Sequence, residues 1–281
     1  MKVIKKLSGL SGCQVLLCED NNSLFVRKIS SSVEYNVRLR RQFIKQKFFK
    51  NPIIKTPIIY SAGKITDKFY FDMEFVRSET MSRKIGGSVS PEDLTKIITF
   101  FFGEIENYPI IKNKSSDQIV LNKIKSIKPS KDVQNSLIFE KGIEKLIQNK
   151  WGNIPYSFCH GDMTLENILM GPSGEIYLID FLDSFIDSWL IDVAKVLQDL
   201  ELGWSWRNEP ADSNRTLKCL IAKDFVINKL LSLKNGEELL HDCYSLLLLN
   251  ILRIYPYLKD SKTEDFLNKK VIYLLNQFKG L

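Results

Sequence analysis

The segments FCHGDMTLENILM, residues 158–170, and YLIDF, residues 177–181, are the most informative part of this 281-residue sequence. Asp162, Asn167 and Asp180 lie at short intervals in these segments, each flanked by apolar residues that are typical of strands. The intervening sequence GPSG predicts a turn, so the two strands should form a hairpin with Asn167 and Asp180 at the same end. Two carboxylates and an amide would then be available to bind a divalent metal ion and to accept a proton.

These three side chains are the groups that magnesium-dependent phosphoryl transfer from ATP requires. One carboxylate must accept the proton of the attacking hydroxyl group, and oxygen ligands must hold the metal against the β- and γ-phosphates. We therefore assign Asp162 as the catalytic base, and Asn167 and Asp180 as metal ligands. Each residue alone would be read as an ordinary turn or strand-end residue, but the combination favours the catalytic interpretation.

Both segments resemble the aminoglycoside phosphotransferase and choline kinase family, which comprises small-molecule kinases with a protein-kinase-like fold. The family motif His-Gly-Asp-x-x-x-x-Asn corresponds to residues 160–167, and its Ile-Asp-Phe metal motif corresponds to residues 179–181. Gly161 stands where protein kinases have Arg, which by this resemblance favours a small-molecule acceptor. The resemblance implies an α/β (α+β) fold with two lobes, a small β-rich N-terminal lobe over residues 1–76 and a larger, mostly helical lobe over residues 77–281.

The N-terminal segment contains the candidates for ATP binding. Lys28, in the strand FVRKI, resembles the strand lysine of kinase-like folds and is expected to reach the α- and β-phosphates. Arg27 competes for this role, but only one of the two can point toward the nucleotide because strand side chains alternate. Backbone groups near the phosphates are expected from Ser8, Gly9, Ser11 and Gly12, although an ordinary hairpin turn uses the same residues. By resemblance, the adenine edge should meet the backbone of Glu74, Phe75 and Val76.

A helix is expected after the lysine strand, and its apolar stripe comprises Val33, Val37, Ile44 and Phe48. In the family, this helix contributes a Glu that pairs with the strand lysine. The sequence departs from that pattern, because Glu34 comes too early and Gln42, near the expected separation, carries no charge. Gln42 is therefore only a candidate partner of Lys28.

The sequence after the catalytic segment predicts helices and an acceptor site. Asp192, near the start of a helix over residues 189–199, is expected to support the catalytic loop through backbone N–H groups. His160 is expected to form a structural hydrogen bond rather than to act as an acid or base. Trp204 and Trp206 could stack on a sugar, surround a quaternary ammonium group or fill the core. The other acceptor-binding candidates are Asp183 and Asp187.

Composition limits the other classes of protein. The formal charge of +7 comes from 40 basic and 33 acidic residues that are interspersed, which favours solvated faces or an electropositive phosphate site. A nucleic-acid-binding protein is a rival interpretation because of Arg38, Arg40, Arg41, Lys45 and Lys47. Five cysteines without a Cys-x-x-Cys pair predict no disulfide framework or zinc site, and fit the cytoplasm. No apolar run approaches the roughly 20 residues of a membrane span, and the N-terminal segment lacks the apolar core of a secretory signal.

The sequence thus predicts an ATP- and Mg²⁺-dependent phosphotransferase with an alcohol group as acceptor, and a sugar or another small alcohol is favoured. A choline or aminoglycoside kinase and a nucleotide-binding pseudokinase without turnover are the alternatives. We expect a small-molecule partner and neither nucleic acid nor a membrane, and the sequence does not indicate an oligomeric state.

Overall fold

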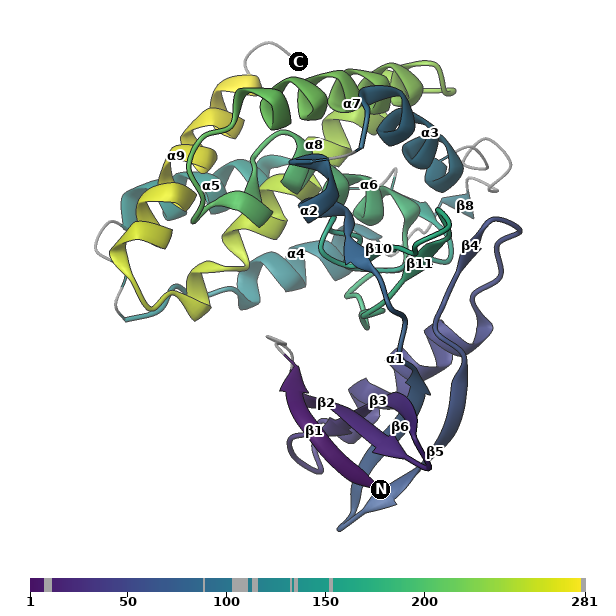
Figure 1. The fold of residues 1–281 in the computed structure, drawn as a ribbon. Helices are drawn as coiled ribbons and strands as arrows, with labels where there is room; N and C mark the ends of the chain where they lie inside the picture. The colour runs from purple at the N-terminus through teal and green to yellow at the C-terminus, as the bar shows by residue number, and fades with distance from the viewer. Residues whose placement is uncertain are drawn as a thin grey trace. The chain divides into compact units, whose positions relative to one another are not determined.

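The computed structural model describes residues 1–7, 12–87, 89–102, 111–112, 116–131, 133, 136–151 and 154–278 (Figure 1). The backbone forms two compact units. The N-terminal unit comprises residues 1–81 and 166–183, and the helical unit comprises residues 82–165 and 184–281. The sequence predicted a single break after Val76, whereas the N-terminal unit also includes the hairpin that follows the catalytic loop. The reason is strand pairing, because both strands of that hairpin pair with strands from the first 81 residues.

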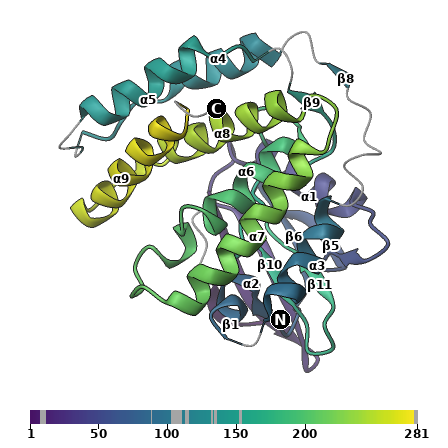
Figure 2. The ribbon, with the colours of Figure 1, turned by 90° about the horizontal axis from the view of Figure 1, so that it is seen from above.

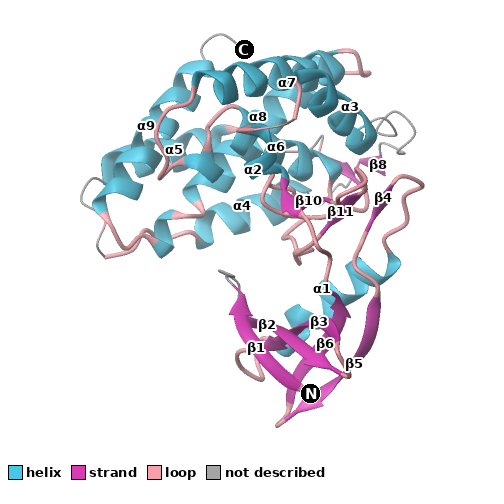
Figure 3. Ribbon diagram, in the orientation of Figure 1, coloured by secondary structure: helices cyan, strands magenta, loops and turns pink. Residues whose placement is uncertain are grey.

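The N-terminal unit is built on a five-stranded antiparallel sheet (Figure 3). Its strands lie in the order β1 (Lys2–Leu7), β2 (Cys13–Asp20), β3 (Ser23–Ser30), β6 (Lys68–Glu74) and β5 (Ile59–Ile65). Asn21 and Asn22 connect β2 to β3 with positive φ angles of 46° and 61°, which Asn tolerates better than most residues. This sheet followed by helices confirms the predicted α+β fold class.

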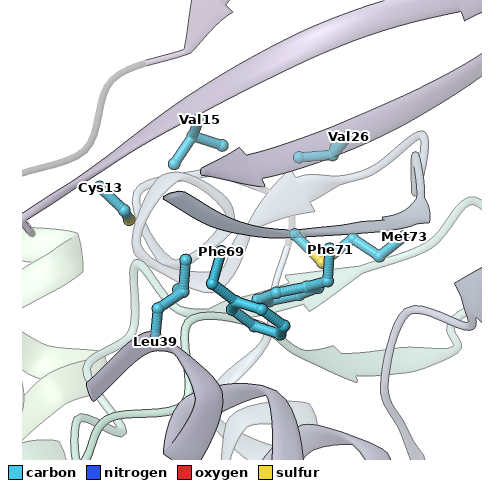
Figure 4. Packing of buried hydrophobic residues seen from close by; sticks show 7 residues of the cluster. All are labelled: Cys13, Val15, Val26, Leu39, Phe69, Phe71 and Met73. Atoms are coloured by element: carbon cyan, nitrogen blue, oxygen red, sulfur yellow. The ribbon is translucent and has the colours of Figure 1, made fainter. Parts of the chain in front are cut away.

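Helix α1 (Asn36–Phe48) packs against this sheet and closes a small hydrophobic core (Figure 4). Full burial of a large apolar side chain stabilises a fold by about 1.5–3 kcal/mol, so even a small cluster anchors the helix firmly. The cluster consists of Cys13, Val15, Val26, Leu39, Phe69, Phe71 and Met73.

The face of α1 that is buried differs from the one that apolar periodicity predicts. Val37 and Phe48, in the predicted stripe, are 61% and 64% exposed, whereas the buried residues are Asn36, Leu39, Gln42 and Gln46. Asn36 donates to the Asp67 carbonyl and accepts from the Phe69 N–H, each at 2.7 Å. Gln46 donates to the Pro57 carbonyl at 3.1 Å. The polar face is buried because its side chains satisfy backbone groups of the neighbouring loops.

A second sheet of the N-terminal unit contains the hairpin that the turn sequence predicted. Its order is β4 (Ile54–Lys55), β11 (Ile176–Leu178), β10 (Ile168–Met170) and β7 (Glu79–Thr80), with β4 parallel to β11. Strands β10 and β11 are antiparallel, and Ile168 lies opposite Leu178. The turn between them has Gly174 at φ 87°, a conformation that favours glycine. The predicted hairpin is therefore confirmed.

The helical unit is organised around α6 (Trp189–Leu200) and α8 (Gly236–Leu252), which pack against each other and are almost entirely buried. Figure 2 shows α5 (Ser136–Gln148) and α9 (Ser261–Gln277) beside α8. Helix α7 (Ser213–Leu231) packs against α3 (Pro91–Phe102), α6 and α8. The remaining elements are α2 (Met81–Ile85), α4 (Ser116–Ser126), the short strands β8 (Ile111–Lys112) and β9 (Pro155–Tyr156), and the 3₁₀ helices η2 (Trp204–Trp206) and η3 (Tyr255–Tyr257).

Side-chain caps start several of these helices where the sequence places short polar residues. Ser90, directly before Pro91 at the start of α3, accepts from the Asp93 N–H at 3.0 Å. Asp212 and Asp260 cap α7 and α9 in the same way. None of the helices in the described part of the chain combines the length and the hydropathy of a membrane-spanning segment.

Candidate active site

The N-terminal unit joins Lys28 to Asp180 by a direct ion pair. The Lys28 Nζ atom lies 2.8 Å from Asp180 Oδ1, and the lysine side chain is only 3% exposed. Burial by itself would lower the pKa of Lys28, but the Asp180 carboxylate, together with Cys13 and Tyr35, outweighs that effect and raises the pKa, so the ammonium stays charged. Arg27 lies on the opposite face of β3, where Asp72 holds it through two hydrogen bonds of 2.7 and 2.8 Å. Strand alternation thus separates the two neighbouring cations.

The β10–β11 hairpin brings Asn167 and Asp180 to one end of the N-terminal unit's second sheet. The Asn167 carbonyl accepts a hydrogen bond from the Ile179 N–H at 3.1 Å, which continues the strand pairing up to these two residues. Asp180 has a φ of 62°, a left-handed conformation that is uncommon for a residue other than glycine and that concentrates at functional sites.

The oxygen atoms of Asn167 and Asp180 fit a hard cation such as Mg²⁺. No group of three His, Cys, Asp or Glu side chains in the described residues could hold a metal by itself. Mg²⁺ does not need one, because it usually binds one or two carboxylates and completes its shell with phosphate oxygens and water. The donor set is therefore compatible with a metal that is held jointly with nucleotide phosphates.

Tyr35 connects Gly12 and Gln42 in the vicinity of Lys28. A Cβ atom at Gly12 would lie 2.6 Å from the Tyr35 ring, so only glycine fits there. The Gln42 side chain donates to the Tyr35 hydroxyl at 3.2 Å, and its Oε1 atom is buried without a hydrogen-bond partner among the described residues. Lys28 pairs with Asp180, and Gln42 bonds to Tyr35. The other predicted loop residues, Ser8, Gly9 and Ser11, lie outside the described residues.

The predicted adenine-binding residues follow the end of β6. The Glu74 N–H donates to the Ile58 carbonyl at 2.8 Å, and the Glu74 carboxylate accepts from the Ile58 N–H at 3.2 Å. Phe75 packs against the core of the sheet, and the Val76 carbonyl accepts from the Ser78 hydroxyl at 3.2 Å. A surface cavity of about 760 Å³ lies between the loop after α1, β4, Tyr177 and Glu74, and among the predicted ATP-binding residues it is lined by Glu74 alone.

The helical unit holds Asp162 in a tightly bonded loop. Gly161 has a φ of 88°, which positions the chain for the turn at Asp162 and favours glycine. The Asp162 N–H donates to His160 Nδ1 at 3.2 Å, and the Asp162 carbonyl accepts from the Thr164 N–H at 2.7 Å. His160 is buried, so its ring is a fixed part of the loop.

Two carboxylates on one face of α6 anchor this loop. Asp192 accepts from the backbone N–H groups of His160 and Gly161, each at 2.7 Å. Asp199 lies two helical turns further on and accepts from the Leu165 N–H at 2.7 Å and from Ser205. The sequence analysis missed Asp199, although its spacing of seven residues from Asp192 places both on the same helix face.

Lys195 from the same helix contacts Asp162 directly and was also missed. Its Nζ atom lies 3.1 Å from Asp162 Oδ1. Burial would raise the pKa of Asp162, but Lys195, together with the nearby His160 and Arg253, outweighs burial and lowers it. Asp162 is therefore a carboxylate at neutral pH, the form that can accept a proton. The available signal was the position of Lys195 three residues after Asp192, on the side of α6 that supports the loop.

The predicted acceptor-binding residues have different surroundings. Trp206 is buried, and its indole N–H donates to the Ser82 carbonyl at 3.0 Å, so it fills the core of the helical unit. Trp204 packs against Phe266, with 6.1 Å between the ring centroids. The Arg207 guanidinium lies over the Trp204 ring, 4.0 Å from its centroid. Asp187 accepts from the Cys159 thiol at 3.5 Å, and Asp183 pairs with Arg41 at 3.2 Å.

The two motif segments and the fold resemble those of protein-kinase-like phosphotransferases. Residues 129–215 match the sequence model of the Phosphotransferase enzyme family, and this segment includes Asp162, Asn167, Asp180 and Lys195. A search of curated protein sequences finds no match. The resemblance inferred from the two motif segments is therefore confirmed over the catalytic part of the chain.

Solved structures extend the likeness of fold to nearly the whole chain. The aminoglycoside phosphotransferase APH(4)-Ia matches with a TM-score of 0.62 and 12% identity, over 97% of this chain and 92% of that one. A protein described as a fructosamine-3-kinase, from Haemophilus somnus 129PT, matches with a TM-score of 0.58 and 15% identity, over 97% of this chain and 92% of that one. The choline kinase LicA from Streptococcus pneumoniae matches with a TM-score of 0.55 and 12% identity, over 97% of this chain and 93% of that one. At such identities the likeness shows the fold alone.

Proposed function

We propose that this protein transfers the γ-phosphoryl group of ATP, in the presence of Mg²⁺, to a hydroxyl group of a small molecule. The observation that carries the proposal is the 2.8 Å ion pair between buried Lys28 and Asp180, with Asn167 at the same end of the hairpin. A buried ammonium next to two oxygen ligands is suited to a polyphosphate with its metal ion. Variants of APH(4)-Ia, which share this fold, form ternary complexes with ADP or AMP-PNP and hygromycin B.

In the proposed reaction, Asp162 orients the acceptor hydroxyl group and takes its proton. The acceptor oxygen then forms a bond to the γ-phosphorus, the bond from that phosphorus to the bridging oxygen breaks, and ADP leaves with the electron pair. Lys28 binds the α- and β-phosphates, and Asn167 and Asp180 hold Mg²⁺. The metal ion, when bound, neutralises negative charge on the phosphates.

The proposed acceptor is a sugar or another small alcohol, and a choline-like amine or an aminoglycoside is the alternative. A polycationic aminoglycoside would be bound best by several unpaired carboxylates. Asp183 and Asp187, the acidic candidates, already have partners in Arg41 and Cys159. Trp204 offers a partly exposed ring on which a sugar could stack, and it is the better aromatic candidate because Trp206 is buried.

A panel of small alcohols tests this proposal. ADP release from Mg·ATP would be measured with sugars, ketoamines, choline and aminoglycosides, each compared with the same reaction in EDTA. We expect at least one sugar or small alcohol to raise ADP release above the rate with water alone, and EDTA to abolish the increase. Release that no acceptor increases would contradict the assignment as an enzyme.

A pseudokinase is the second candidate, and one observation favours it. Gln42, which lies near the helix position expected for the family's lysine-binding Glu, is neutral and bonds to Tyr35. Nucleotide binding with a normal affinity, together with no phosphorylated product from any acceptor, would support this alternative.

A further inference from the structure

The positive charge that faces Asp162 comes from α6, because the catalytic segment has none of its own. Residues 162–167, DMTLEN, contain no Lys or Arg. A phosphoryl group in transfer carries negative charge on its three equatorial oxygens, and its stabilisation depends on cations at fixed positions. The proposed metal ligands and Lys28 belong to the N-terminal unit, whereas Asp162 belongs to the helical unit, where a cation of α6 pairs with it. Lys195 is that cation.

Lys195 is held in place by two contacts that leave room for a third. Its side chain is only 12% exposed, and Nζ bonds to Asp162 Oδ1 at 3.1 Å and to Gln198 Oε1 at 3.2 Å. Gln198 is fully buried one helical turn along α6 and therefore fixes the direction of the lysine. An ammonium group has three N–H donors, so it can keep both bonds and donate the remaining hydrogen to another oxygen.

Two other cationic or basic groups near Asp162 also lower its pKa. His160 uses Nδ1 to accept from the Asp162 N–H. Arg253, just after α8, donates to Asn250 at 3.3 Å and stacks over Phe185 at 5.4 Å. Lys195 forms a direct ion pair with the carboxylate of the proposed base.

We propose that Lys195 is a further catalytic residue, which binds an oxygen of the transferring phosphoryl group while it holds the Asp162 carboxylate. This inference rests on the proposed phosphotransferase function. The acceptor proton moves to Asp162, the phosphorus–oxygen bonds exchange as described above, and Lys195 keeps all three of its protons. Its charge offsets the negative charge that the carboxylate would otherwise direct at the incoming phosphoryl group, which would raise the barrier to transfer.

The test compares nucleotides that differ in the γ-phosphate. Dissociation constants for Mg·AMP-PNP and Mg·ADP would be measured by calorimetry for the wild type, Lys195→Met and Lys195→Arg, with Lys96→Met as the control. Lys96 is an exposed lysine on α3 that lies 4.0 Å from the exposed carboxylate of Asp93. Loss of one charged donor typically lowers kcat by roughly 10²–10³-fold. We expect that loss in Lys195→Met, an affinity for AMP-PNP about tenfold lower relative to ADP, and partial recovery in Lys195→Arg.

A structural role would give a different result. If Lys195→Met folds, as judged by its melting temperature, and keeps the wild-type ratio of AMP-PNP to ADP affinity, Lys195 does not contact the γ-phosphoryl group. If that variant does not fold, the same ratio in Lys195→Arg and Lys195→Gln decides the question. If the wild type transfers phosphate and the Lys195 variants do so equally well, this inference is contradicted and the proposed function is not. A wild-type protein that binds neither nucleotide contradicts the proposed function as well.

Discussion

At the scale of single residues, the environment of Asp162 predicts its chemical role most directly. The carboxylate is ionised at neutral pH because Lys195, together with His160 and Arg253, more than compensates for burial and lowers its pKa. Replacement with Asn keeps the shape of the side chain and removes its basicity. We therefore expect Asp162→Asn to lower kcat roughly 10²–10⁴-fold, while the dissociation constant for Mg·ATP changes little.

Steady-state kinetics and nucleotide titration measure these two effects separately. Asp224→Asn is the matched control, because Asp224 is an exposed carboxylate on α7 of the same unit. Turnover that survives in Asp162→Asn at the level of this control would remove Asp162 from the role of base.

A second residue, Asp242, makes stability depend on pH. It is buried in α8, and burial raises its pKa to about 7, with the nearby Glu238 and Asp117 carboxylates acting in the same direction. Because the folded-state pKa lies above the unfolded value, the protonated group contributes stability that is fully present below about pH 4 and is lost as the pH rises through about 7.

Asp242→Asn should remove this dependence, because Asn has a similar shape and does not titrate. Each pKa unit corresponds to about 1.4 kcal/mol, so between about pH 5 and pH 8 the wild type should lose a few kcal/mol more than the variant. Urea unfolding at both pH values measures the difference. Parallel losses in wild type and variant would show that Asp242 is ionised in the folded protein throughout.

At the scale of elements, α1 shows that polar side chains can determine which helix face is buried. Asn36→Ala removes two hydrogen bonds of 2.7 Å and leaves the Asp67 carbonyl and the Phe69 N–H without their partner. We expect a loss of about 1–3 kcal/mol in the free energy of unfolding. Val37→Ala, on the exposed face one residue away, should change it by less than about 0.5 kcal/mol. A larger loss for Val37→Ala than for Asn36→Ala in urea unfolding would reverse the assignment of the two faces.

At the scale of the whole molecule, the proposed reaction needs groups from both units. The N-terminal unit carries Lys28, Asn167 and Asp180, and the helical unit carries Asp162 and Lys195, with the chain passing from one to the other between Leu165 and Glu166. The proposed catalytic motif is therefore divided between two compact units. A ligand that binds only the native protein should stabilise the protein against unfolding.

Mg·ATP at about 100 times its dissociation constant should stabilise the native protein by about 2.7 kcal/mol. Asp180→Ala removes a proposed metal ligand, so its stabilisation by ATP should no longer depend on Mg²⁺. Thermal unfolding with ATP, in Mg²⁺ or in EDTA, measures this dependence. The control is Asp20→Ala, because Asp20 has an exposed carboxylate that pairs with the N-terminal amine at 2.9 Å. A variant at Asp180 that still responds to Mg²⁺ as the control does would contradict the metal assignment.

The resemblance of the two motif segments to a known family implied the fold class, and local sequence patterns predicted the hairpin at Gly174 and the helices of the second half of the chain. These features depend on turn residues, strand alternation and helix caps, which act over a few residues. The candidate set Asp162, Asn167 and Asp180 could be named for the same reason, because one short stretch contains all three. Long-range contacts could not be read in this way.

The partners of Lys28 and Asp162 depend on packing between segments that are far apart in sequence. The Lys28–Asp180 pair joins a strand of the first sheet to the end of the second, and Lys195 meets Asp162 only because α6 lies against the catalytic loop. Apolar periodicity pointed to the wrong face of α1, since hydrogen bonds to distant backbone groups outweigh it there. The sequence alone thus names the candidate reactive groups, whereas their charges and partners follow from tertiary contacts, because electrostatic interactions depend on distance in space and on burial.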